Sequence, residues 1–330
     1  MSNLAKLSGR NLLVVGRAGM DFFPDPPGTP VQHGTVFHSG LGGSSANIAV
    51  AICKLGGQAA LVTTLSDDAV GDFCRQQLIN YGIDDQFVRK ITGEFRTSLA
   101  VYESRVENHK TVIYRNNAAD FQMDMQDVEA PDYSAYSGMI TTGTVFAANP
   151  SRDAGFRAME LARQADIPVI FDIDYRPYSW VSAEVASDVL TRAAGFSDII
   201  IGNDEEFDFV AGKAGAGLAL ARELGEDPGK IIVYKMGPDG SITIKGGVEF
   251  ATGIFQVDAL KPTGAGDSFM GGFIASLAAG KPLQDCVIRG SAAAAITVTK
   301  PGCAPALPYD AEIDAFIADH AGLSNAPEKE

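Results

Sequence analysis

The sequence contains few residues of the kinds that build metal clusters or disulfide frameworks. Its four cysteines, Cys53, Cys74, Cys286 and Cys303, lie far apart and form no CxxC pair. The four histidines, at positions 33, 38, 109 and 320, are equally scattered. This spacing argues against zinc sites and disulfide scaffolds. Reduced thiols are expected instead, as in cytoplasmic proteins.

Long apolar runs and an excess of positive charge are also missing. No apolar stretch approaches the roughly 20 residues that a membrane-crossing helix needs, and residues 1–10 are too polar for a signal peptide. Lysine and arginine number 26 against 41 aspartates and glutamates, which gives a formal net charge of −15. We therefore expect no nucleic-acid partner, no membrane partner and a cytoplasmic location. The negative net charge does not exclude a small anionic ligand. At contact distance, a few nearby arginines outweigh the electrostatic field of the whole protein.

The chain is long and apolar enough for one large α/β domain. It has 330 residues, of which 46% are hydrophobic and 20% charged. Apolar runs predict strands at 11–15, 60–65, 138–142, 169–173, 199–202 and 231–235. Helical periodicity predicts helices at 42–55, 69–81, 152–164, 183–194, 215–224, 266–279 and 283–297. This alternation indicates parallel strands joined by right-handed helical crossovers.

Two segments interrupt the alternation, at about 17–40 and 96–118. The first is rich in proline and glycine and ends in an alternating stretch, and the second contains two short strands joined by a polar turn. We expect these strands to form a small lid inserted in a single domain that spans residues 1–330. A hairpin is predicted at 240–255, with its turn at Gly246-Gly247.

Glycines surround one acidic residue at the start of the helix predicted at 266–279. Gly264, Ala265 and Gly266 precede Asp267 directly. Backbone N–H groups at such a helix start can approach an anion closely. A carboxylate there can accept a proton from an attacking hydroxyl while the amides hold a transferring phosphoryl group. The alternative is an aspartate that merely favours the first helical turn, but that role does not explain the glycines on both sides.

Two common phosphate-binding signatures are absent. The chain contains no GxxxxGK[ST] segment, which excludes a P-loop enzyme. Residues 40–45 begin like GxGxxG, but Ser45 stands where the third glycine belongs. This stretch also follows the predicted lid instead of the first strand. A dinucleotide-binding fingerprint is therefore not expected.

The motifs resemble those of the ribokinase-like family, also called phosphofructokinase B. Its paired signatures are similar to GGSSANIA at 42–49 and TGAGD at 263–267, and shorter matches follow in family order at Gly16 with Asp21, at 203–206 and at 235–240. These matches cover about residues 11–305. The resemblance implies a three-layer α/β/α core with a mostly parallel sheet, a small β-strand lid and an ATP-dependent sugar kinase.

The resemblance also implies roles for particular residues. Asp267 would be the catalytic base, with Gly264, Ala265 and Gly266 forming the anion hole. Sugar hydroxyls would contact Asp21, Gly42, Gly43 and Asn47, and the nucleotide would contact Asn203, Lys235, Gly237 and Gly240. Asn203 and Glu206 would act on Mg²⁺ through water. The alternative for residues 203–206 is a helix cap followed by a solvated acidic face.

Arginines suggest which kind of sugar is bound. Arg115 ends a predicted lid strand in YRxxxAAD, and Arg176 follows a core strand in DIDYRPxxW. Two converging guanidinium groups would favour an acid sugar over a neutral one, although each could instead be a surface salt-bridge partner. Both motifs resemble those of 2-keto-3-deoxygluconate kinases and, more closely, of 5-dehydro-2-deoxygluconokinases of inositol breakdown. The opening at 16–21 resembles the latter too, which makes Arg17 a third candidate contact.

The substrate implied is 5-dehydro-2-deoxy-D-gluconate, phosphorylated at its primary hydroxyl. A 2-keto-3-deoxygluconate kinase, a fructokinase and a nucleoside kinase remain open. A non-catalytic sugar-binding protein is the alternative from another class. The presence of Asp267 and its glycines argues against that last alternative.

Lys261 departs from the family pattern. Many family members have an acidic residue six positions before the base, near a monovalent-cation site, whereas this chain has Lys261 there. Its ammonium group would occupy or repel the K⁺ position, which puts activation by potassium in doubt. An exposed loop lysine is the alternative. Because lid strands in this family often pair between subunits, we also expect a homodimer.

Overall fold

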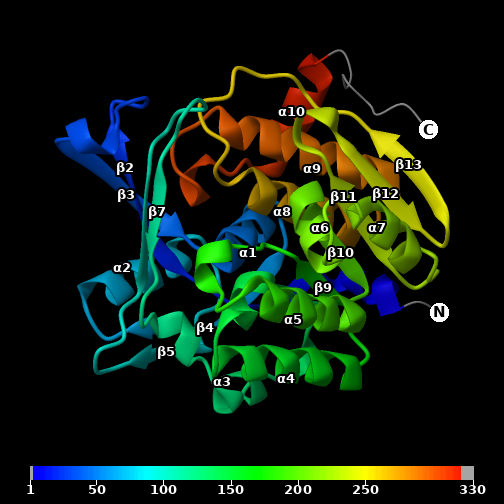
Figure 1. Ribbon diagram of the computed structural model, residues 1–330, viewed down its shortest axis with the longest axis horizontal. Coiled ribbons are helices and arrows are strands. Elements are labelled where there is room, and N and C mark those ends of the chain that lie inside the picture. Colours follow the sequence, from blue (N-terminus) through cyan, green and yellow to red (C-terminus); the bar gives the residue numbers. More distant parts are fainter. Residues whose placement is uncertain (1–2, 321–330) are drawn as a thin grey trace.

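The computed structural model describes residues 3–320 and arranges them in three layers (Figure 1). Among these residues, nine strands form the central sheet in the order β13-β12-β11-β10-β9-β8-β1-β4-β5. Neighbouring strands are parallel from β11 to β5, and only the β11–β12 and β12–β13 pairs are antiparallel. The strands are β1 (Asn11–Val15), β4 (Gln58–Ser66), β5 (Val88–Ile91), β8 (Gly138–Thr142), β9 (Val169–Asp172), β10 (Ile199–Asn203), β11 (Ile231–Lys235), β12 (Ser241–Lys245) and β13 (Val248–Thr252).

The central strands are apolar on both faces. In β1, Leu12 and Val14 belong to one buried cluster, whereas Leu13 and Val15 belong to the cluster on the opposite face. Successive side chains of a strand point to opposite faces, so an unbroken apolar run fills two cores. This is the pattern of a parallel sheet covered by helices on both sides.

Helices cover the two faces of the sheet. One face carries α1 (Ser44–Lys54), α2 (Ala69–Asn80), α8 (Ala265–Ala278) and α9 (Leu283–Val298), with α10 (Asp310–Asp319) packed on α9. The other face carries α3 (Met125–Glu129), α4 (Ser151–Gln164), α5 (Ala183–Phe196), α6 (Asp204–Val210) and α7 (Gly217–Gly225). Within residues 3–320, none of the helices has the length and apolar character needed to cross a bilayer.

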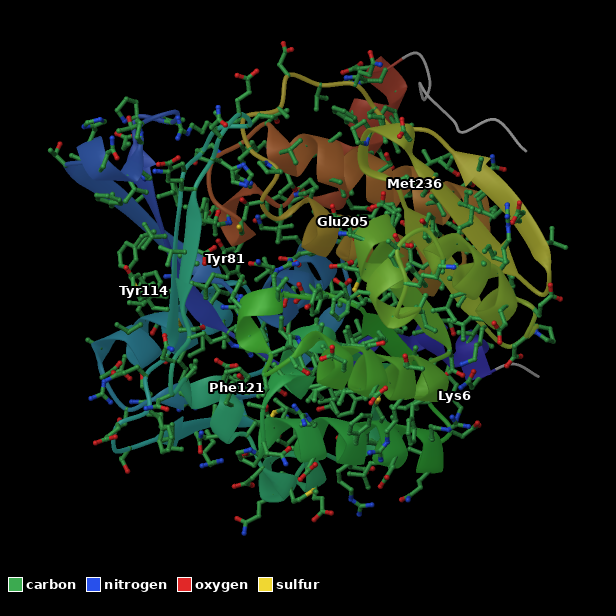
Figure 2. All side chains as sticks on the ribbon, viewed as in Figure 1. Lys6, Tyr81, Tyr114, Phe121, Glu205 and Met236 are labelled. Carbon is green, nitrogen blue, oxygen red and sulfur yellow. The ribbon has the colours of Figure 1, made fainter. Side chains whose placement is uncertain are left out.

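A second, four-stranded sheet stands at one side of the molecule, next to α2 (Figure 1). Its order is β3-β2-β6-β7, from β2 (Gly19–Asp25), β3 (Val36–Gly42), β6 (Ser98–Tyr102) and β7 (Thr111–Tyr114). Figure 2 shows the labelled Tyr114 on the outer side of β7, and this side chain is exposed. Because β2 closely follows β1 and β3 runs into α1 through Gly43, the lid joins the core where these elements meet.

The predicted fold class is confirmed, and most predicted core elements lie within a few residues of their observed bounds. β5, α3 and α10 were not predicted, and α6 was implied only by the alternative that made Asn203 a helix cap. β5, α3 and α6 are short, with four, five and seven residues. The assignment of all 330 residues to one domain stays a prediction.

Gly271 allows α1 and α8 to pack closely. A Cβ atom on Gly271 would lie only 2.2 Å from the Cβ of Ala51 on α1. The two helices also carry Asn47 and Asp267, which form a hydrogen bond across the same contact. The absence of a side chain at Gly271 therefore sets the separation of these two polar residues.

We expect Gly271→Ala to destabilise the protein, because the added methyl group must push α1 away from α8. Overpacking of this kind costs about 1–3 kcal/mol, which urea denaturation followed by circular dichroism measures. The matched control is Gly195→Ala in α5, where an added Cβ meets nothing within 4 Å. That change should be neutral or stabilise by up to ~1 kcal/mol. Equal stability of the two variants would contradict the close packing of α1 on α8.

Candidate active site

A cavity of about 610 Å³ lies between the carboxyl ends of the central strands and the lid sheet. Ligand sites of open α/β sheets lie at this edge. All residues proposed from the sequence line the cavity except Gly42. They are Arg17, Asp21, Gly43, Asn47, Arg115, Arg176, Asn203, Glu206, Lys235, Gly237, Gly240, Gly264, Ala265, Gly266 and Asp267.

Gly42 lies behind Asp21 and is not among the residues that line the cavity. A Cβ atom on Gly42 would meet Oδ1 of Asp21 at 1.9 Å. We therefore assign Gly42 a spacing role in place of the ligand contact expected from the sequence. Its missing side chain leaves room for a carboxylate whose pKa burial raises to about 6, against the opposing charge of Arg17.

The first turn of α8 forms one wall of the cavity. Gly264 is the N-cap residue and adopts a φ of 86°, a left-handed conformation that glycine accepts without strain. The chain then enters α8 at Ala265, and the first N–H groups of a helix have no partner within the helix. The turn from Gly264 to Asp267 lines the cavity. This geometry suits an anion held by backbone amides.

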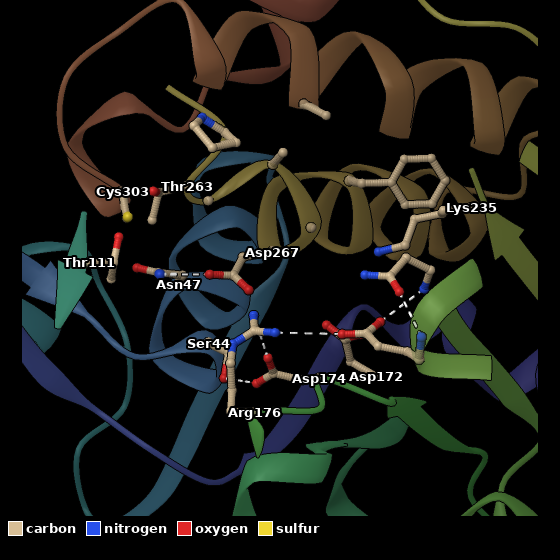
Figure 3. A pocket seen from close by; sticks show the side chains of 18 of the residues that line it. Ser44, Asn47, Thr111, Asp172, Asp174, Arg176, Lys235, Thr263, Asp267 and Cys303 are labelled. Atoms are coloured by element: carbon tan, nitrogen blue, oxygen red, sulfur yellow. Dashed lines mark hydrogen bonds and ion pairs between the residues drawn. The ribbon is translucent and has the colours of Figure 1, made fainter. Parts of the chain in front are cut away.

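Asp267 contacts Asn47 directly in the cavity wall (Figure 3). Nδ2 of Asn47 donates a hydrogen bond of 2.7 Å to Oδ2 of Asp267. Burial, together with the negative charge of Asp174, raises the pKa of Asp267 to about 7, although the bond from Asn47 opposes this shift. Oδ1 of Asn47 is buried and has no partner among the described residues. The pair thus places a carboxylate in the cavity beside an amide that donates to it.

Two further carboxylates, Asp172 and Asp174, lie where β9 ends (Figure 3). Oδ2 of Asp174 accepts a bond of 2.7 Å from the hydroxyl of Ser44, and its Oδ1 lies 2.7 Å from Nη2 of Arg176. Burial opposes ionisation, but Arg176 and Ser44 hold the pKa of Asp174 below its usual value. Burial raises the pKa of Asp172 well above its usual value, although Lys235 opposes the shift.

Neither Asp172 nor Asp174 was proposed from the sequence, although both belong to the motif that contains Arg176. A signal was available, because they occupy alternate positions after a buried strand at the ligand-binding edge. Ser44 was missed in the same way, within the glycine-rich signature. Its role depends on Asp174, which lies far away in the chain, and no local pattern reveals such a pairing.

Asn203 and Glu206 form the helix cap that the sequence left as an alternative. Oδ1 of Asn203 accepts from the Glu206 N–H at 2.8 Å, and Oε2 of Glu206 accepts from the Asn203 N–H at 2.9 Å. This is a capping box at the start of α6, so the helix-cap interpretation is confirmed. Both residues also line the cavity. The acids between them, Asp204 and Glu205, are exposed.

Lys235, at the end of β11, faces the same turn of α8 (Figure 3). A Cβ atom on Gly266 would lie 3.6 Å from Nζ of Lys235. Gly237 and Gly240 follow Lys235 and line the same part of the cavity. An ammonium group next to the first turn of a helix adds to the attraction of that turn for an anion.

The three arginines differ in their partners. Arg115 is buried, pairs with Asp120, donates to the carbonyl of Thr144 at 3.0 Å, and its guanidinium lies 4.0 Å from the Phe121 ring centroid. A surface salt bridge is therefore the wrong interpretation for Arg115. Its Nη1 is buried and has no partner among residues 3–320. Arg176 remains 45% exposed and pairs with Asp174.

Arg17 is the guanidinium that lacks an acidic partner. It is buried in the cavity wall and donates from Nη1 to the hydroxyl of Ser98 at 3.0 Å. No carboxylate of the described residues lies within 4 Å of its nitrogens. This positive charge is available to an anionic ligand.

Lys261 is fully buried, so the interpretation as an exposed loop lysine was wrong. Its Nζ donates to the carbonyl of Thr263 at 2.6 Å and to that of Thr297 at 3.4 Å. Burial lowers the pKa of Lys261, and the negative charges of nearby groups, including Asp21 and Asp267, oppose this.

Comparison of the sequence with known proteins shows the family to which the chain belongs. The family model of pfkB family carbohydrate kinases matches residues 10–310. The chain belongs to this family. It is therefore a carbohydrate kinase, which agrees with a cavity that contains a helix start and the carboxylate of Asp267.

Several relatives and solved structures resemble this kinase. A 5-dehydro-2-deoxygluconokinase of Photobacterium profundum is 39% identical over 96% of this chain and 98% of its own. A protein of the same name from Geobacillus kaustophilus is 34% identical over 96% of both chains. A double-mutant fructokinase of Vibrio cholerae, solved with fructose, ADP and potassium ion, is 25% identical with a TM-score of 0.81, over 93% of this chain and 97% of its own.

The pKa of Asp267 predicts how the activity of the kinase depends on pH. A general base must be ionised to accept a proton, so kcat/KM should fall about tenfold per pH unit below a pKa of about 7. In Asn47→Ala, the hydrogen bond that lowers this pKa is lost. The acidic limb of the kcat/KM profile should therefore move to higher pH. A limb that stays in place or moves to lower pH contradicts the assignment.

Asp267→Asn is the control for this profile. The amide cannot accept the hydroxyl proton, so turnover should fall by about 10²–10⁴-fold at every pH. Sugar binding, measured by calorimetry, should change little because the amide keeps the size of the carboxylate. Turnover near that of the wild type would show that another group is the base.

Proposed function

We propose that this kinase transfers the γ-phosphoryl group of ATP to the primary hydroxyl of 5-dehydro-2-deoxy-D-gluconate, a keto-deoxy sugar acid. The names of relatives that are 34–39% identical over nearly the full chain support this substrate. The structures of a fructokinase with ADP and of an aminoimidazole riboside kinase with an ATP analogue support the nucleotide.

The unpaired guanidinium of Arg17 is the observation that carries the choice of an acid sugar. A buried charge is costly unless a partner compensates it. The hydrogen bond of Arg17 goes to the neutral Ser98 hydroxyl, and Asp21, Asp174 and Asp267 act on its charge without forming an ion pair within 4 Å. A substrate carboxylate would supply the missing partner in bidentate geometry. A neutral sugar such as fructose offers no such charge. Arg115 also lines the cavity, so it adds a second positive charge near the same ligand.

The proposed reaction is an in-line displacement next to the first turn of α8. The sugar hydroxyl gives its proton to Asp267, its oxygen forms the new bond to phosphorus, and the bond to the bridging oxygen of ADP breaks. Amides of Ala265 and Gly266 would hold the transferring group, and Lys235 would face the nucleotide phosphates. Catalysis would come mainly from positioning and charge neutralisation, as phosphoryl transfer generally requires.

The acidic residues near Lys235 fit a water-bound Mg²⁺ ion. Among residues 3–320, no cluster of three or more acidic, histidine or cysteine side chains could hold a metal by itself. Mg²⁺ with nucleotides usually keeps several waters and uses one or two carboxylates. Glu206 and Asp172 are buried carboxylates in this cavity, and burial raises the pKa of each. We propose that Glu206, with Asn203, would hold the ion through water, and the ion would neutralise phosphate charge.

The phosphoryl donor and the cysteines support a proposed cytoplasmic location. ATP is the expected donor for this kinase. Cys53, Cys74, Cys286 and Cys303 are all free thiols in the structure. Reducing compartments keep cysteines in this form.

Replacing Arg17 tests the carboxylate assignment. We expect Arg17→Ala to lower kcat/KM for 5-dehydro-2-deoxygluconate about 100-fold or more, because a buried charge-assisted pair is lost. Activity on fructose, a neutral sugar, should change only a few-fold. A coupled ADP-release assay over both sugars and 2-keto-3-deoxygluconate gives the comparison.

The control for Arg17→Ala is Arg157→Ala, an arginine of α4 that pairs with Glu129 outside the cavity. This variant should behave like the wild type with every sugar. Arg176→Ala also frees Asp174 from its partner, so it should lower activity on acid and neutral sugars alike. If Arg17→Ala lowered kcat/KM equally for both sugars, Arg17 would not bind a substrate carboxylate. If the wild type preferred 2-keto-3-deoxygluconate or fructose, that sugar would replace the proposed substrate.

We also propose a homodimer formed through the lid. Its outer strands β3 and β7 carry exposed apolar side chains, which include Val36, Phe37, Val112 and Tyr114. Unpaired edge strands with apolar side chains favour pairing with a second copy. Light scattering after gel filtration should give a dimer for the wild type and a monomer for Val36→Glu. Val181→Glu, at a 90% exposed position outside the lid, should remain a dimer; a monomeric wild type contradicts the proposal.

A further inference from the structure

The ammonium group of Lys261 has an unusual environment. The side chain is completely buried, and no carboxylate of the described residues lies within 4 Å of Nζ. Its hydrogen-bond partners are two backbone carbonyls, those of Thr263 and Thr297. Burying an ammonium group without a paired anion is strongly unfavourable, and an apolar side chain of the same size would generally give a more stable core. A role in stability alone therefore does not explain the charge.

The two carbonyls belong to the ends of two different helices. Thr263 directly precedes Gly264, the left-handed N-cap of α8, and Thr297 lies in the last turn of α9. The backbone N–H of Lys261 also donates to the carbonyl of Val298 at 3.2 Å. The C-terminal carbonyls of a helix carry partial negative charge and attract cations. Lys261 thus links the end of α9 to the turn that begins α8.

This link fixes the turn that would bind the phosphoryl group. The bond of 2.6 Å to Thr263 holds the peptide immediately before Gly264. A second connection, of 2.7 Å between the hydroxyls of Ser268 and Thr297, joins the same two helices one turn later. The orientation of the amides of Ala265 and Gly266 therefore depends on the peptide that Lys261 holds. Lys261 itself does not line the cavity, so it acts from behind the turn.

Backbone carbonyls around a single positive charge are also how proteins bind monovalent cations. A related fructokinase was solved with a potassium ion. In this chain, the positive charge at the carbonyls of Thr263 and Thr297 is the ammonium group of Lys261, which is part of the protein itself.

We propose that Lys261 is a positioning residue whose ammonium group serves as a tethered monovalent cation, holding the turn 263–266 in the shape that binds the transferring phosphoryl group. The proposal rests on the proposed phosphoryl-transfer role of this turn and not on the identity of the sugar. It has a direct consequence for the wild-type enzyme. At constant ionic strength, kcat should be the same within twofold in potassium, sodium and choline chloride.

Two variants separate the charge of Lys261 from its volume. Lys261→Met keeps most of the volume and removes the charge, so kcat should fall about 100-fold with little change in KM for the sugar or in Tm. Lys261→Ala leaves space beside the carbonyls of Thr263 and Thr297. The kcat of Lys261→Ala should also fall. About 100 mM potassium or ammonium should raise this kcat at least tenfold, whereas choline should not change it. Lys261→Met should not be rescued, because the methionine side chain fills the site.

Three results would overturn the proposal. They are several-fold activation of the wild type by potassium, a kcat of Lys261→Met within threefold of the wild type, and failure of potassium and ammonium to rescue a folded Lys261→Ala. If Lys261→Ala does not fold, the wild-type kcat in potassium, sodium and choline chloride and the kcat of Lys261→Met still test the proposal. The assays use whichever sugar the wild type phosphorylates best, so a wrong substrate assignment does not affect them. The calorimetric affinity for a non-hydrolysable ATP analogue, which carries the γ-phosphoryl position, should weaken in Lys261→Met and gives a readout independent of turnover.

Discussion

The first turn of α8, from Gly264 to Asp267, is the part of the cavity on which the proposed chemistry depends. A helix N-terminus attracts an anion because its first N–H groups and its dipole point toward the ligand. Gly264 provides the left-handed entry, and Lys261 holds the preceding peptide from behind. Asp267 belongs to the same turn, so a proton acceptor and the amides stand next to one another. Gly271 then allows α1 to approach closely enough for Asn47 to reach Asp267.

This arrangement requires many charges in a small volume. Asp21, Asp172, Glu206 and Asp267 all have a raised pKa because burial disfavours their ionised forms. Asp174 is the exception, because Arg176 and the Ser44 hydroxyl stabilise its charge. Arg17 has no acid of its own, and it lies where β1 leads into the lid. A substrate carboxylate at this position would complete the pairing of charges.

Sequence patterns predicted the parts of this molecule that depend on local chemistry. Apolar runs located the central strands, and the glycines around Asp267 indicated an anion-binding helix start. Pairings between distant segments could not be predicted. Acids stand close in sequence to all three arginines, namely Asp120 near Arg115, Asp174 near Arg176 and Asp21 near Arg17, and only the fold shows that the first two form ion pairs and the third does not. Lys261 shows the same limit, since a lysine beside a proline suggests an exposed loop until the end of α9 packs over it.

The central claim is that the kinase recognises a sugar through a carboxylate as well as through its hydroxyls. The most direct test compares wild-type kcat/KM for 5-dehydro-2-deoxygluconate with that for the same sugar after reduction of its carboxylate to an alcohol. The two compounds share the attacking hydroxyl and the keto group and differ only in the acid. We predict that the acid is preferred about 100-fold or more, as expected when a buried charge would otherwise lack its partner. Similar values for the two compounds would contradict the claim.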